Sequence, residues 1–421
     1  MSSSKILLLR SYYFPEVFSS SYILSQNIEA LIKEHEILLY TPLPSRGVEK
    51  NIRKRYKRIR RELFFDGKLV VRRFSLFAEG KNPVLRGVRY FILCLKLFYI
   101  GSFTKYARSA DVIMVSSTPP IIGPTAALIK KFRHIPVVYN LQDIFPDSLV
   151  GTGLAKKGGL LWKVGRKIED FTYRNADKII VISEDFKRNI MAKGVPEEKI
   201  EVIYNWVDEN AVVPIAKEDN TLFEELGIER GPFYVVYAGN LGHAQNVQVL
   251  LDAAMKLQGE TGIRFLIFGT GGLKNDYEKF VKEHELNNVR FFPLQPVEKV
   301  SQVYSLADAS LVSCKKGLGG SAMPSKTWSI LSAGTPVLCS FDGGGDLQHI
   351  IEDNKLGLFS EAGDFDALAE NIKRLFNDRQ MCREYGENGR NYILNNLTKE
   401  IGTSRYVEVL RQFDKRQQSK R

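Results

Sequence analysis

Short runs of apolar residues alternate with longer, helix-like patterns from one end of the chain to the other. Many of these runs are continuous stretches of Val, Ile, Leu and Phe, which is typical of parallel strands covered by helices on both faces. Strand–helix–strand units on this scale predict right-handed crossovers and an α/β, doubly wound architecture. The expected strands are residues 5–10, 36–40, 69–73, 112–116, 137–140, 179–183, 202–204, 233–238, 264–268, 289–292, 309–312 and 337–340.

One segment breaks this rhythm. The stretch from Asp208 to Gly231 is polar, contains Pro214 and lacks strand-like runs. A chain of 421 residues is too long for one small core and fits two domains of roughly 150–200 residues each. We therefore expect an N-terminal domain (1–208), a C-terminal domain (209–395), and a helix with a basic tail (396–421) that packs back on the N-terminal domain. In doubly wound domains, ligands bind at the carboxyl ends of the strands.

Composition adds a preference for anionic partners. The chain holds 60 Lys and Arg against 48 Asp and Glu, a formal net charge of +12, which suits nucleic acid, an anionic membrane surface or a phosphorylated substrate. Its four cysteines are scattered without a CxxC pair, which predicts reduced thiols and a cytoplasmic protein. The most apolar stretch, Val88 to Phe103, is interrupted by Arg89 and Lys96, so we expect no membrane-spanning helix.

Three glycine-rich turns flank expected strands in the second half of the chain. Gly239-Asn240-Leu241-Gly242 and Gly269-Thr270-Gly271-Gly272 follow strands, whereas Ala333-Gly334-Thr335-Pro336 precedes one. Glycine after a strand allows backbone N–H groups to approach a phosphate or a ribose closely, although any α/β protein also needs glycine to close such turns. Neither the GxGxxG nor the GxxxxGK(S/T) pattern occurs, which disfavours a nicotinamide dehydrogenase or a P-loop NTPase.

Between the second and third turns lies the segment Pro324-Ser325-Lys326. Proline suits the first turn of a helix, where free N–H groups, a serine hydroxyl and a lysine charge would together hold a diphosphate. An ordinary helix start with an exposed lysine explains the same three residues equally well.

In combination, these motifs resemble those of family 4 glycosyltransferases of the GT-B fold, over the chain as far as about Tyr406. The similar segments are 177–183 (DKIIVIS), 194–196 (GVP), 201–208 (EVIYNWVD), 324–326 (PSK) and 333–337 (AGTPV). Segment 141–148 (LQDIFPDS), together with Trp206, is similar to the WbuB-like branch, which contains amino-sugar transferases of O-antigen and capsule assembly.

The resemblance implies two Rossmann-like domains facing across a cleft, with a nucleotide-sugar donor bound mainly by the second and no obligatory metal or other cofactor. It implies a retaining transferase that moves an N-acetylated sugar from a UDP-sugar to a polyprenyl-diphosphate-linked acceptor in surface polysaccharide biosynthesis. Lys326 would stabilise the departing diphosphate. The implied donor-binding residues are Gly239, Asn240, Gly242, Gln245, Gly269, Gly271, Ser321, Pro324, Ser325 and Ser329.

Several positions depart from the family pattern. Two glutamates that most members carry eight positions apart are Ser321 and Ser329 here, and the usual Arg and Lys of the first C-terminal turn are Asn240 and Gln245. A serine hydroxyl cannot replace a charge-assisted pair of hydrogen bonds. These changes concentrate the positive charge for the leaving diphosphate on Lys326.

The N-terminal domain is expected to hold the acceptor. Asp143 follows a buried strand and is our candidate for orienting the acceptor hydroxyl, although a turn or helix-capping aspartate before Pro146 would look the same. The first N-terminal loop, where the family has Gly-Gly, reads Phe18-Ser19-Ser20-Ser21, which argues against a close backbone approach to the donor there.

A basic run from Arg46 to Arg61 contains nine Lys or Arg and one acidic residue, Glu49. Such a run usually marks a solvated helical face, yet the apolar, aromatic stretch from Tyr90 to Phe103 follows it. Cations beside an aromatic patch suit an anionic membrane surface. We therefore expect peripheral attachment to the inner face of the plasma membrane through Arg53, Lys54, Lys57, Arg58 and Arg61.

Three alternatives remain open. A UDP-sugar 2-epimerase of the same fold needs a cleft rich in carboxylates, which this motif region lacks. The missing glutamates would permit a catalytically silent scaffold of a polysaccharide-assembly complex. A nucleic-acid binder ranks last, because no recognised binding module accompanies the positive charge.

Overall fold

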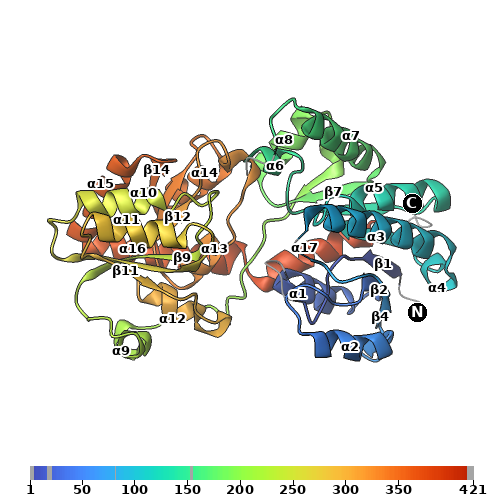
Figure 1. Ribbon diagram of the computed structural model, residues 1–421, viewed down its shortest axis with the longest axis horizontal. Helices are drawn as coiled ribbons and strands as arrows, with labels where there is room; N and C mark the ends of the chain where they lie inside the picture. The colour runs from blue at the N-terminus through green and yellow to red at the C-terminus, as the bar shows by residue number, and fades with distance from the viewer. Residues whose placement is uncertain (1–3, 17–20, 81, 152–154, 415–421) are drawn as a thin grey trace. The chain divides into compact units, whose positions relative to one another are not determined.

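The computed structural model describes residues 4–16, 21–80, 82–151 and 155–414, and it divides into two compact units (Figure 1). The N-terminal unit joins the chain up to Tyr204 with the segment from Glu400 onwards. The C-terminal unit is the continuous segment Asn205–Lys399. Each unit is built around a sheet of its own.

The described strands of the N-terminal unit form one sheet in the order β3-β4-β2-β1-β5-β6-β7-β8. Neighbours pair in parallel except β3, which pairs antiparallel with β4 at the sheet edge. The strands are β1 (Lys5–Leu9), β2 (Glu36–Pro42), β3 (Arg61–Phe64), β4 (Leu69–Phe74), β5 (Val112–Ser116), β6 (Val137–Leu141), β7 (Lys178–Val181) and β8 (Ile200–Val202). The helices are α1 (Ser21–Leu31), α2 (Lys50–Arg58), α3 (Pro83–Phe103), α4 (Lys105–Arg108), α5 (Ile122–Arg133), α6 (Asp147–Gly151), α7 (Leu160–Asn175), α8 (Glu184–Ala192) and α17 (Lys399–Arg411).

The C-terminal unit has a parallel sheet in the order β11-β10-β9-β12-β13-β14. Its strands are β9 (Phe233–Asn240), β10 (Ile263–Thr270), β11 (Val289–Phe292), β12 (Ala309–Ser313), β13 (Val337–Phe341) and β14 (Gly357–Glu361). Its helices are α9 (Leu222–Glu225), α10 (Gln248–Lys256), α11 (Lys274–Glu283), α12 (Val300–Ser305), α13 (Lys326–Ser332), α14 (Asp346–Asp353), α15 (Phe365–Asn377) and α16 (Arg379–Asn396).

Both sheets reverse their strand order at one point. In the C-terminal unit the chain first winds from β9 through β10 to β11, and then from β12 through β13 to β14 on the other side of β9. The same reversal separates β1 from β5 in the N-terminal unit. Ligands of doubly wound sheets bind outside the carboxyl ends of the strands at such a switch point. The carboxyl ends of β9 and β12 are therefore where a ligand site is expected.

Continuous apolar strands form the core of each unit. In the C-terminal unit, Val235 on β9 and Phe265 and Ile267 on β10 are fully buried, as is the indole of Trp328 on α13. Removing such a side chain from water contributes roughly 1.5–3 kcal/mol. Because helices cover both faces of the sheet, nearly every strand position is apolar, which is the pattern that identified the strands.

The predicted α/β architecture of two Rossmann-like sheets is confirmed, and each of the expected strands overlaps an observed one. Two described strands, β3 and β14, lie outside the prediction. β14 begins at Gly357, where a Cβ atom would lie 1.9 Å from the carbonyl oxygen of Val337. Glycine is thus what allows β14 to pair closely with β13, although glycine in a sequence usually indicates a break in a strand.

The boundaries between the units differ from the expected positions 208 and 395. They fall after Tyr204 and after Lys399. The polar segment that follows position 208 is fastened to the C-terminal unit, because Ser332 Oγ and Arg390 Nη1 both donate to Val212 O, at 2.6 and 3.0 Å. These bonds lie inside the part of the chain that was expected to be C-terminal, and the unit extends beyond the expected range 209–395 at both ends.

The helix α17 near the end of the chain belongs to the N-terminal unit. Arg405 Nη2 donates to Glu201 Oε1 at 3.0 Å, and Arg411 Nε donates to Glu34 Oε2 at 2.7 Å. The basic tail, residues 415–421, and the loop residues Phe18, Ser19 and Ser20 lie outside the described residues.

Candidate functional site

Lys326 begins α13, and its side chain reaches the carboxyl end of β9. A Cβ atom built on Gly239 would lie 2.7 Å from Lys326 Nζ, so the absence of a side chain at Gly239 leaves room for the ammonium group. The same ammonium lies 4.0 Å from the centroid of the Tyr237 ring, which is a cation–π contact. The structure therefore places a positive charge at the switch point of the C-terminal sheet.

This ammonium group is unusual because it is desolvated without a counter-charge. Burial lowers the pKa of Lys326 from 10.5 to about 8, and no carboxylate of the described residues pairs with it to oppose that effect. An anion placed beside Nζ would raise the pKa again and would offset the desolvation. A buried, unpaired cation beside a glycine-rich turn is typical of a binding site for an anionic group.

The first glycine-rich turn places two neutral amides beside this lysine. Asn240 Nδ2 donates to Gln245 Oε1 at 3.1 Å, and a Cβ on Gly242 would lie only 2.8 Å from Asn240 Nδ2. Tyr237 Oη donates to Asn240 O at 2.7 Å, so one tyrosine both faces the ammonium and fixes the turn. Of the expected donor-binding residues, the structure thus brings together Gly239, Asn240, Gly242, Gln245 and Lys326.

Gly269 and Gly271, in the second glycine-rich turn, serve the packing of the two turns. A Cβ on Gly269 would lie 2.4 Å from Gly239 O, and a Cβ on Gly271 would lie 2.3 Å from Leu241 O. Any side chain at either position would push the second turn away from the first. These glycines therefore position the site, and their conformation does not require a bound ligand as an explanation.

Pro324 and Ser325 precede α13 rather than forming its first turn. The helix begins at Lys326 with Ser325 as the N-cap residue, whose side chain makes no capping hydrogen bond. The N–H groups of Thr327 and Trp328 donate to Pro324 O and Ser325 O. These two amides are therefore not free to bind a diphosphate, and a role of Pro324 and Ser325 in donor binding stays a prediction. Positive charge at this position rests on the Lys326 side chain.

The remaining expected donor residues carry no charge. Ser321 Oγ donates to Leu318 O at 3.2 Å, and Ser329 is half-buried within α13. The third glycine-rich turn lies elsewhere: Gly334 has a φ of 72° and ends α13 just before β13. This turn is consequently at the amino end of a strand, on the edge of the sheet opposite Gly239.

Four further residues lie at the carboxyl ends of these strands, and no sequence pattern above identified them. Besides Tyr237, these include Asp342, which directly follows β13 and accepts hydrogen bonds from Gly317 N at 2.8 Å and Gly319 N at 2.7 Å. The loop that Asp342 holds also presents two exposed lysines. The two lysines are Lys315 and Lys316. Their position just after an expected strand could have identified them, whereas no local sequence pattern links Asp342 to its hydrogen-bond partners.

In the N-terminal unit, Asp143 lies just beyond the carboxyl end of β6. Its N–H donates to Ser117 Oγ at 3.1 Å, and its carboxylate accepts a hydrogen bond from the Ser148 side chain. Burial raises the pKa of Asp143, and the Ser148 hydrogen bond opposes this rise. The bond to Ser148, in the first turn of α6, matches the turn-aspartate alternative, and a role toward an acceptor hydroxyl stays a prediction.

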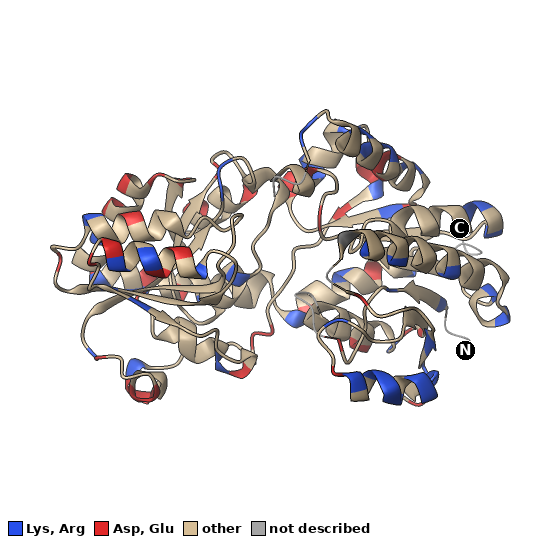
Figure 2. Ribbon diagram, viewed as in Figure 1, with Lys and Arg blue, Asp and Glu red and all other residues tan. Residues whose placement is uncertain are grey.

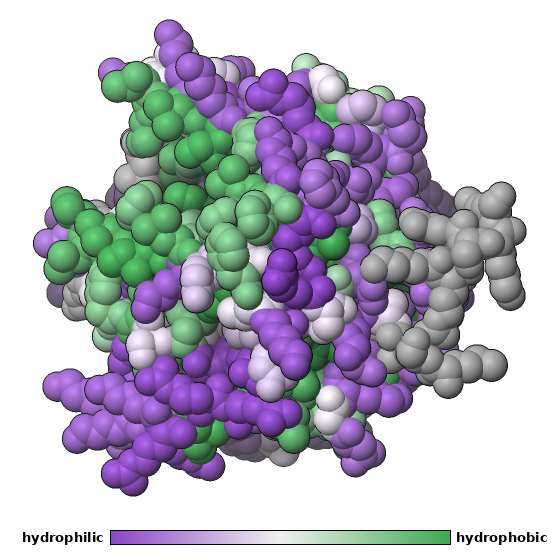
Figure 3. Space-filling view, turned by 90° about the vertical axis from the view of Figure 1, so that its right-hand side faces the viewer, coloured by the Kyte–Doolittle hydropathy of each residue, from purple (hydrophilic) through white to green (hydrophobic). Residues whose placement is uncertain are grey.

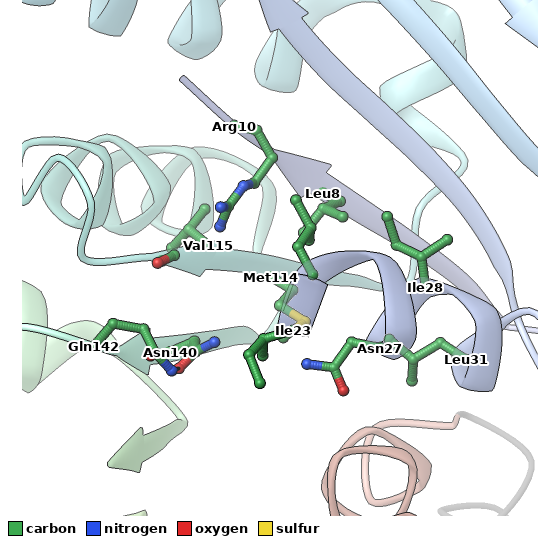
Figure 4. Close-up of a pocket in the computed structure, with 12 residues that line it drawn as sticks. Leu8, Arg10, Ile23, Asn27, Ile28, Leu31, Met114, Val115, Asn140 and Gln142 are labelled. Carbon is green, nitrogen blue, oxygen red and sulfur yellow. Dashed lines mark hydrogen bonds between the residues drawn. The ribbon is translucent and has the colours of Figure 1, made fainter. Parts of the chain in front are cut away.

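A hollow in the same unit lies between α1 and the strands β1 and β5 (Figure 4). Its lining is mostly aliphatic, and Arg10, Asn140 and Gln142 add polar groups. Burial lowers the pKa of Arg10 to about 10. Gln142 Nε2 donates to Asn140 Oδ1 at 2.8 Å, so two of the polar side chains that line the hollow are bonded to each other.

The basic run forms helix α2 and the residues that follow it (Figure 2). Arg53 differs from the other expected membrane contacts, because its Nη1 donates to Leu43 O at 3.1 Å and to Pro44 O at 2.6 Å. The Arg53 guanidinium thus fixes the loop after β2, and a contact of Arg53 with a membrane stays a prediction. The other members of the set are exposed: Lys54, Lys57, Arg58 and Arg61.

Helix α3 has an apolar face that the described residues of its unit leave exposed. Phe91, Leu95 and Tyr99 follow one another at helical spacing and are 60%, 54% and 63% exposed. Figure 3 shows apolar side chains gathered on this face beside a strongly hydrophilic group. No helix within the described ranges is long and apolar enough to cross a membrane. An exposed apolar patch of this kind marks an interaction surface.

Comparisons with known proteins place both units in one class of enzyme. The family model described as Glycosyltransferase Family 4 matches residues 24–211, and the model described as Glycosyl transferases group 1 matches residues 218–392. The probable glycosyltransferase WbjE of Pseudomonas aeruginosa is 26% identical over 72% of this chain and 75% of its own. The putative colanic acid biosynthesis glycosyl transferase WcaI of Escherichia coli K12 is 27% identical over 91% and 95%.

Solved structures share the fold. HepE of Anabaena, solved in complex with UDP and glucose, gives a TM-score of 0.71 at 16% identity and covers 97% of this chain and 100% of its own. Sucrose-phosphate synthase of Thermosynechococcus elongatus gives a TM-score of 0.74 at 16% identity, over 97% and 98%. At this level of identity the likeness shows the fold alone, and the expected GT-B class is confirmed.

Proposed function

Because the chain is a glycosyltransferase that joins a family 4 half to a group 1 half, we propose that it builds a surface polysaccharide such as an O-antigen or a capsule. In this proposal it transfers an N-acetylated sugar from a UDP-sugar, with retention of configuration, to a polyprenyl-diphosphate-linked saccharide. The name of WcaI, which refers to colanic acid biosynthesis, supports the pathway class. The similarity of residues 141–148 to the WbuB-like branch supports an amino sugar.

One observation carries the donor side of this proposal. The Lys326 ammonium is buried without a counter-charge at the switch point of the C-terminal sheet. In a retaining transfer, the acceptor oxygen attacks the face from which the diphosphate departs, so the main requirement is to stabilise negative charge on the leaving group. Lys326 contributes to that stabilisation, and the proposed reaction uses neither a metal nor another cofactor. Asp143 orients the acceptor hydroxyl.

Donor binding is the first test. At a UDP concentration about 100-fold above the dissociation constant, binding to the folded protein should stabilise it by about 2.7 kcal/mol. The shift is measured by thermal unfolding with UDP, and uridine serves as the control without phosphate. No shift with UDP or with any other nucleoside diphosphate would contradict a nucleotide-sugar donor.

Turnover is the second test, because a silent scaffold can also bind UDP. We expect UDP release from one of several UDP-N-acetylhexosamines only when a lipid-diphosphate-linked saccharide is present, and an α-linked product from an α-linked donor. Binding without release for every donor would favour the scaffold. Release of UDP and a C2-epimerised sugar without an acceptor would favour the epimerase.

We further propose that the protein attaches peripherally to the inner face of the plasma membrane. The apolar face of α3 and the exposed cations of α2 belong to one unit and together suit an anionic bilayer, at about 1 kcal/mol per basic residue near the headgroups. Reversing the charges of Lys54, Lys57 and Arg58 should release the protein from vesicles rich in phosphatidylglycerol. Lys282→Glu, on α11, is the matched control, and unchanged binding of the triple variant would refute this role.

A further inference from the structure

The loop that follows β12 carries two lysines whose charges meet no carboxylate among the described residues. Lys315 and Lys316 are both exposed. Because β12 and β9 are neighbours on either side of the switch point, this loop leaves the same edge of the sheet as the first glycine-rich turn. Both lysines therefore lie at the carboxyl ends of the strands, as does the Lys326 ammonium.

Hydrogen bonds hold this loop against the first turn. Lys315 N donates to Ala244 O at 2.9 Å, and Ser313 Oγ donates to Gln245 O at 2.6 Å. On the other side, the Asp342 carboxylate binds the N–H groups of Gly317 and Gly319. Gly317 has a φ of 88°, a left-handed conformation that favours glycine. A backbone fixed on both sides lowers the entropy that is lost when the lysines bind a ligand.

The other polar groups at the carboxyl ends of β9 and β12 supply too little positive charge to balance a diphosphate. Asn240 and Gln245 are neutral and hydrogen-bonded to each other. The Lys326 ammonium lies against Gly239 and the Tyr237 ring. A departing diphosphate carries more negative charge than a single ammonium neutralises. A site that binds and releases a diphosphate at this edge consequently needs further cations.

We propose that Lys315 and Lys316 supply this positive charge, and that they contact the diphosphate of the nucleotide-sugar both in the donor and as it departs. The inference rests on the proposed function, because it assigns two further binding residues to the same donor site. In this proposal the exposed contacts to the phosphate groups come from the β12 loop, and the first glycine-rich turn provides none of them.

Binding of UDP and of uridine to the full-length protein, measured at low and high salt, tests this proposal. Lys315→Ala and Lys316→Ala should each weaken UDP binding about fivefold to tenfold, as expected for loss of a charge-assisted contact to phosphate. Uridine binding should not change, because uridine lacks the diphosphate. The Lys→Arg variants should retain most of the UDP affinity. Lys282→Ala, an exposed lysine on α11, is the matched control and should have no effect.

The outcomes separate this inference from the proposed function. If the wild-type protein binds no nucleoside diphosphate, the proposed function fails and this inference fails with it. If the wild type binds UDP but the Lys315→Ala/Lys316→Ala double variant binds it equally well, with the same salt dependence, the inference alone is overturned. Equal losses of UDP and uridine affinity would also overturn it, since the loop would then shape the nucleoside site.

Discussion

Lys326 in the C-terminal unit and Lys193 in the N-terminal unit are both half-buried, but their surroundings are opposite. Lys193 Nζ lies 2.8 Å from Asp147 Oδ2 and 3.1 Å from Glu169 Oε1. The Lys326 ammonium has instead an aromatic ring and a glycine as its neighbours. One charge has been neutralised by the protein, and the other has not.

The carboxylates around Lys193 are held by further partners. Glu169 also accepts from Tyr173 Oη, and Asp147 accepts from Trp162 Nε1 at 3.3 Å. This network joins α6, α7 and the end of α8. An ion pair within such a hydrogen-bond network holds helices together, whereas a desolvated cation without a partner is left for a ligand. Substitutions of the two lysines should therefore have opposite effects on activity and stability.

The largest effect is expected for Lys326→Met, which keeps the length of the side chain and removes its charge. Turnover should fall about 1,000-fold, as when a group that stabilises a developing anion is lost. The thermal midpoint without ligand should stay the same or rise, because a desolvated charge has been removed. Steady-state UDP release and thermal unfolding measure the two quantities. Lys326→Arg should retain more activity than Lys326→Met, and near-wild-type turnover in the methionine variant would remove Lys326 from the site.

Lys193→Met should show the reverse behaviour. Without the ammonium, Asp147 loses its ionic partner whereas Glu169 keeps Arg166, and unfolding should become easier by about 2 kcal/mol. Denaturant unfolding of the full-length protein measures this loss, and the KM for the donor should not change. Lys167→Met, an exposed lysine on α7, is the control. If Lys193→Met and Lys167→Met unfold at the same denaturant concentration, the network is not what holds these helices.

The sequence predicts a helix or strand correctly where burial of its side chains determines the residue types along its whole length. Strands covered on both faces must be apolar at nearly every position, so β9, β10 and their neighbours were identified with nearly correct bounds. The prediction failed where one contact decides the structure. β14 depends on the close approach to Val337 that Gly357 allows, and a glycine is not a strand signal in a sequence.

The candidate site, like the fold, was predicted only in part. Glycines after strands and a lysine after a proline identified Gly239 and Lys326, which the structure places together. Their common neighbour Tyr237 was not found, because an aromatic residue inside an apolar strand looks like an ordinary core residue. Arg53 and Lys54 are adjacent and chemically alike, yet only the structure shows that Arg53 is bound to loop carbonyls.

A smaller effect is expected when pH is used to alter the charge of Lys326. The amine is charged below its pKa of about 8, so UDP affinity should fall about tenfold between roughly pH 7 and pH 9. At pH 8, binding should take up about half a proton, because the bound anion raises the pKa. Calorimetry in buffers of different ionisation enthalpy measures this uptake.

The same pKa shift has a consequence for the ligand-free protein. A lysine whose pKa is lowered by folding disfavours the folded state while it is charged, so stability should rise with pH from about 8 to about 10. Lys326→Arg should show neither the proton uptake nor this rise. An identical pH profile in the arginine variant would assign the titration to another group.

The smallest expected effect comes from adding charge to the first glycine-rich turn. Gln245 is neutral, and its contact with Asn240 is a single amide hydrogen bond of 3.1 Å. Gln245→Lys should therefore raise UDP affinity only about threefold in the wild-type protein, since exposed charge pairs contribute up to about 1 kcal/mol. In the Lys315→Ala/Lys316→Ala background the same substitution should recover part of the lost affinity, because a cation on the turn would then replace cations on the neighbouring loop. Recovery for UDP but not for uridine would show that the two segments meet the same phosphate groups. If Gln245→Lys raised UDP affinity equally in the wild type and in the double variant, the turn and the loop would act independently. Lys326 would then be the one lysine here whose missing counter-charge is explained by a bound phosphate.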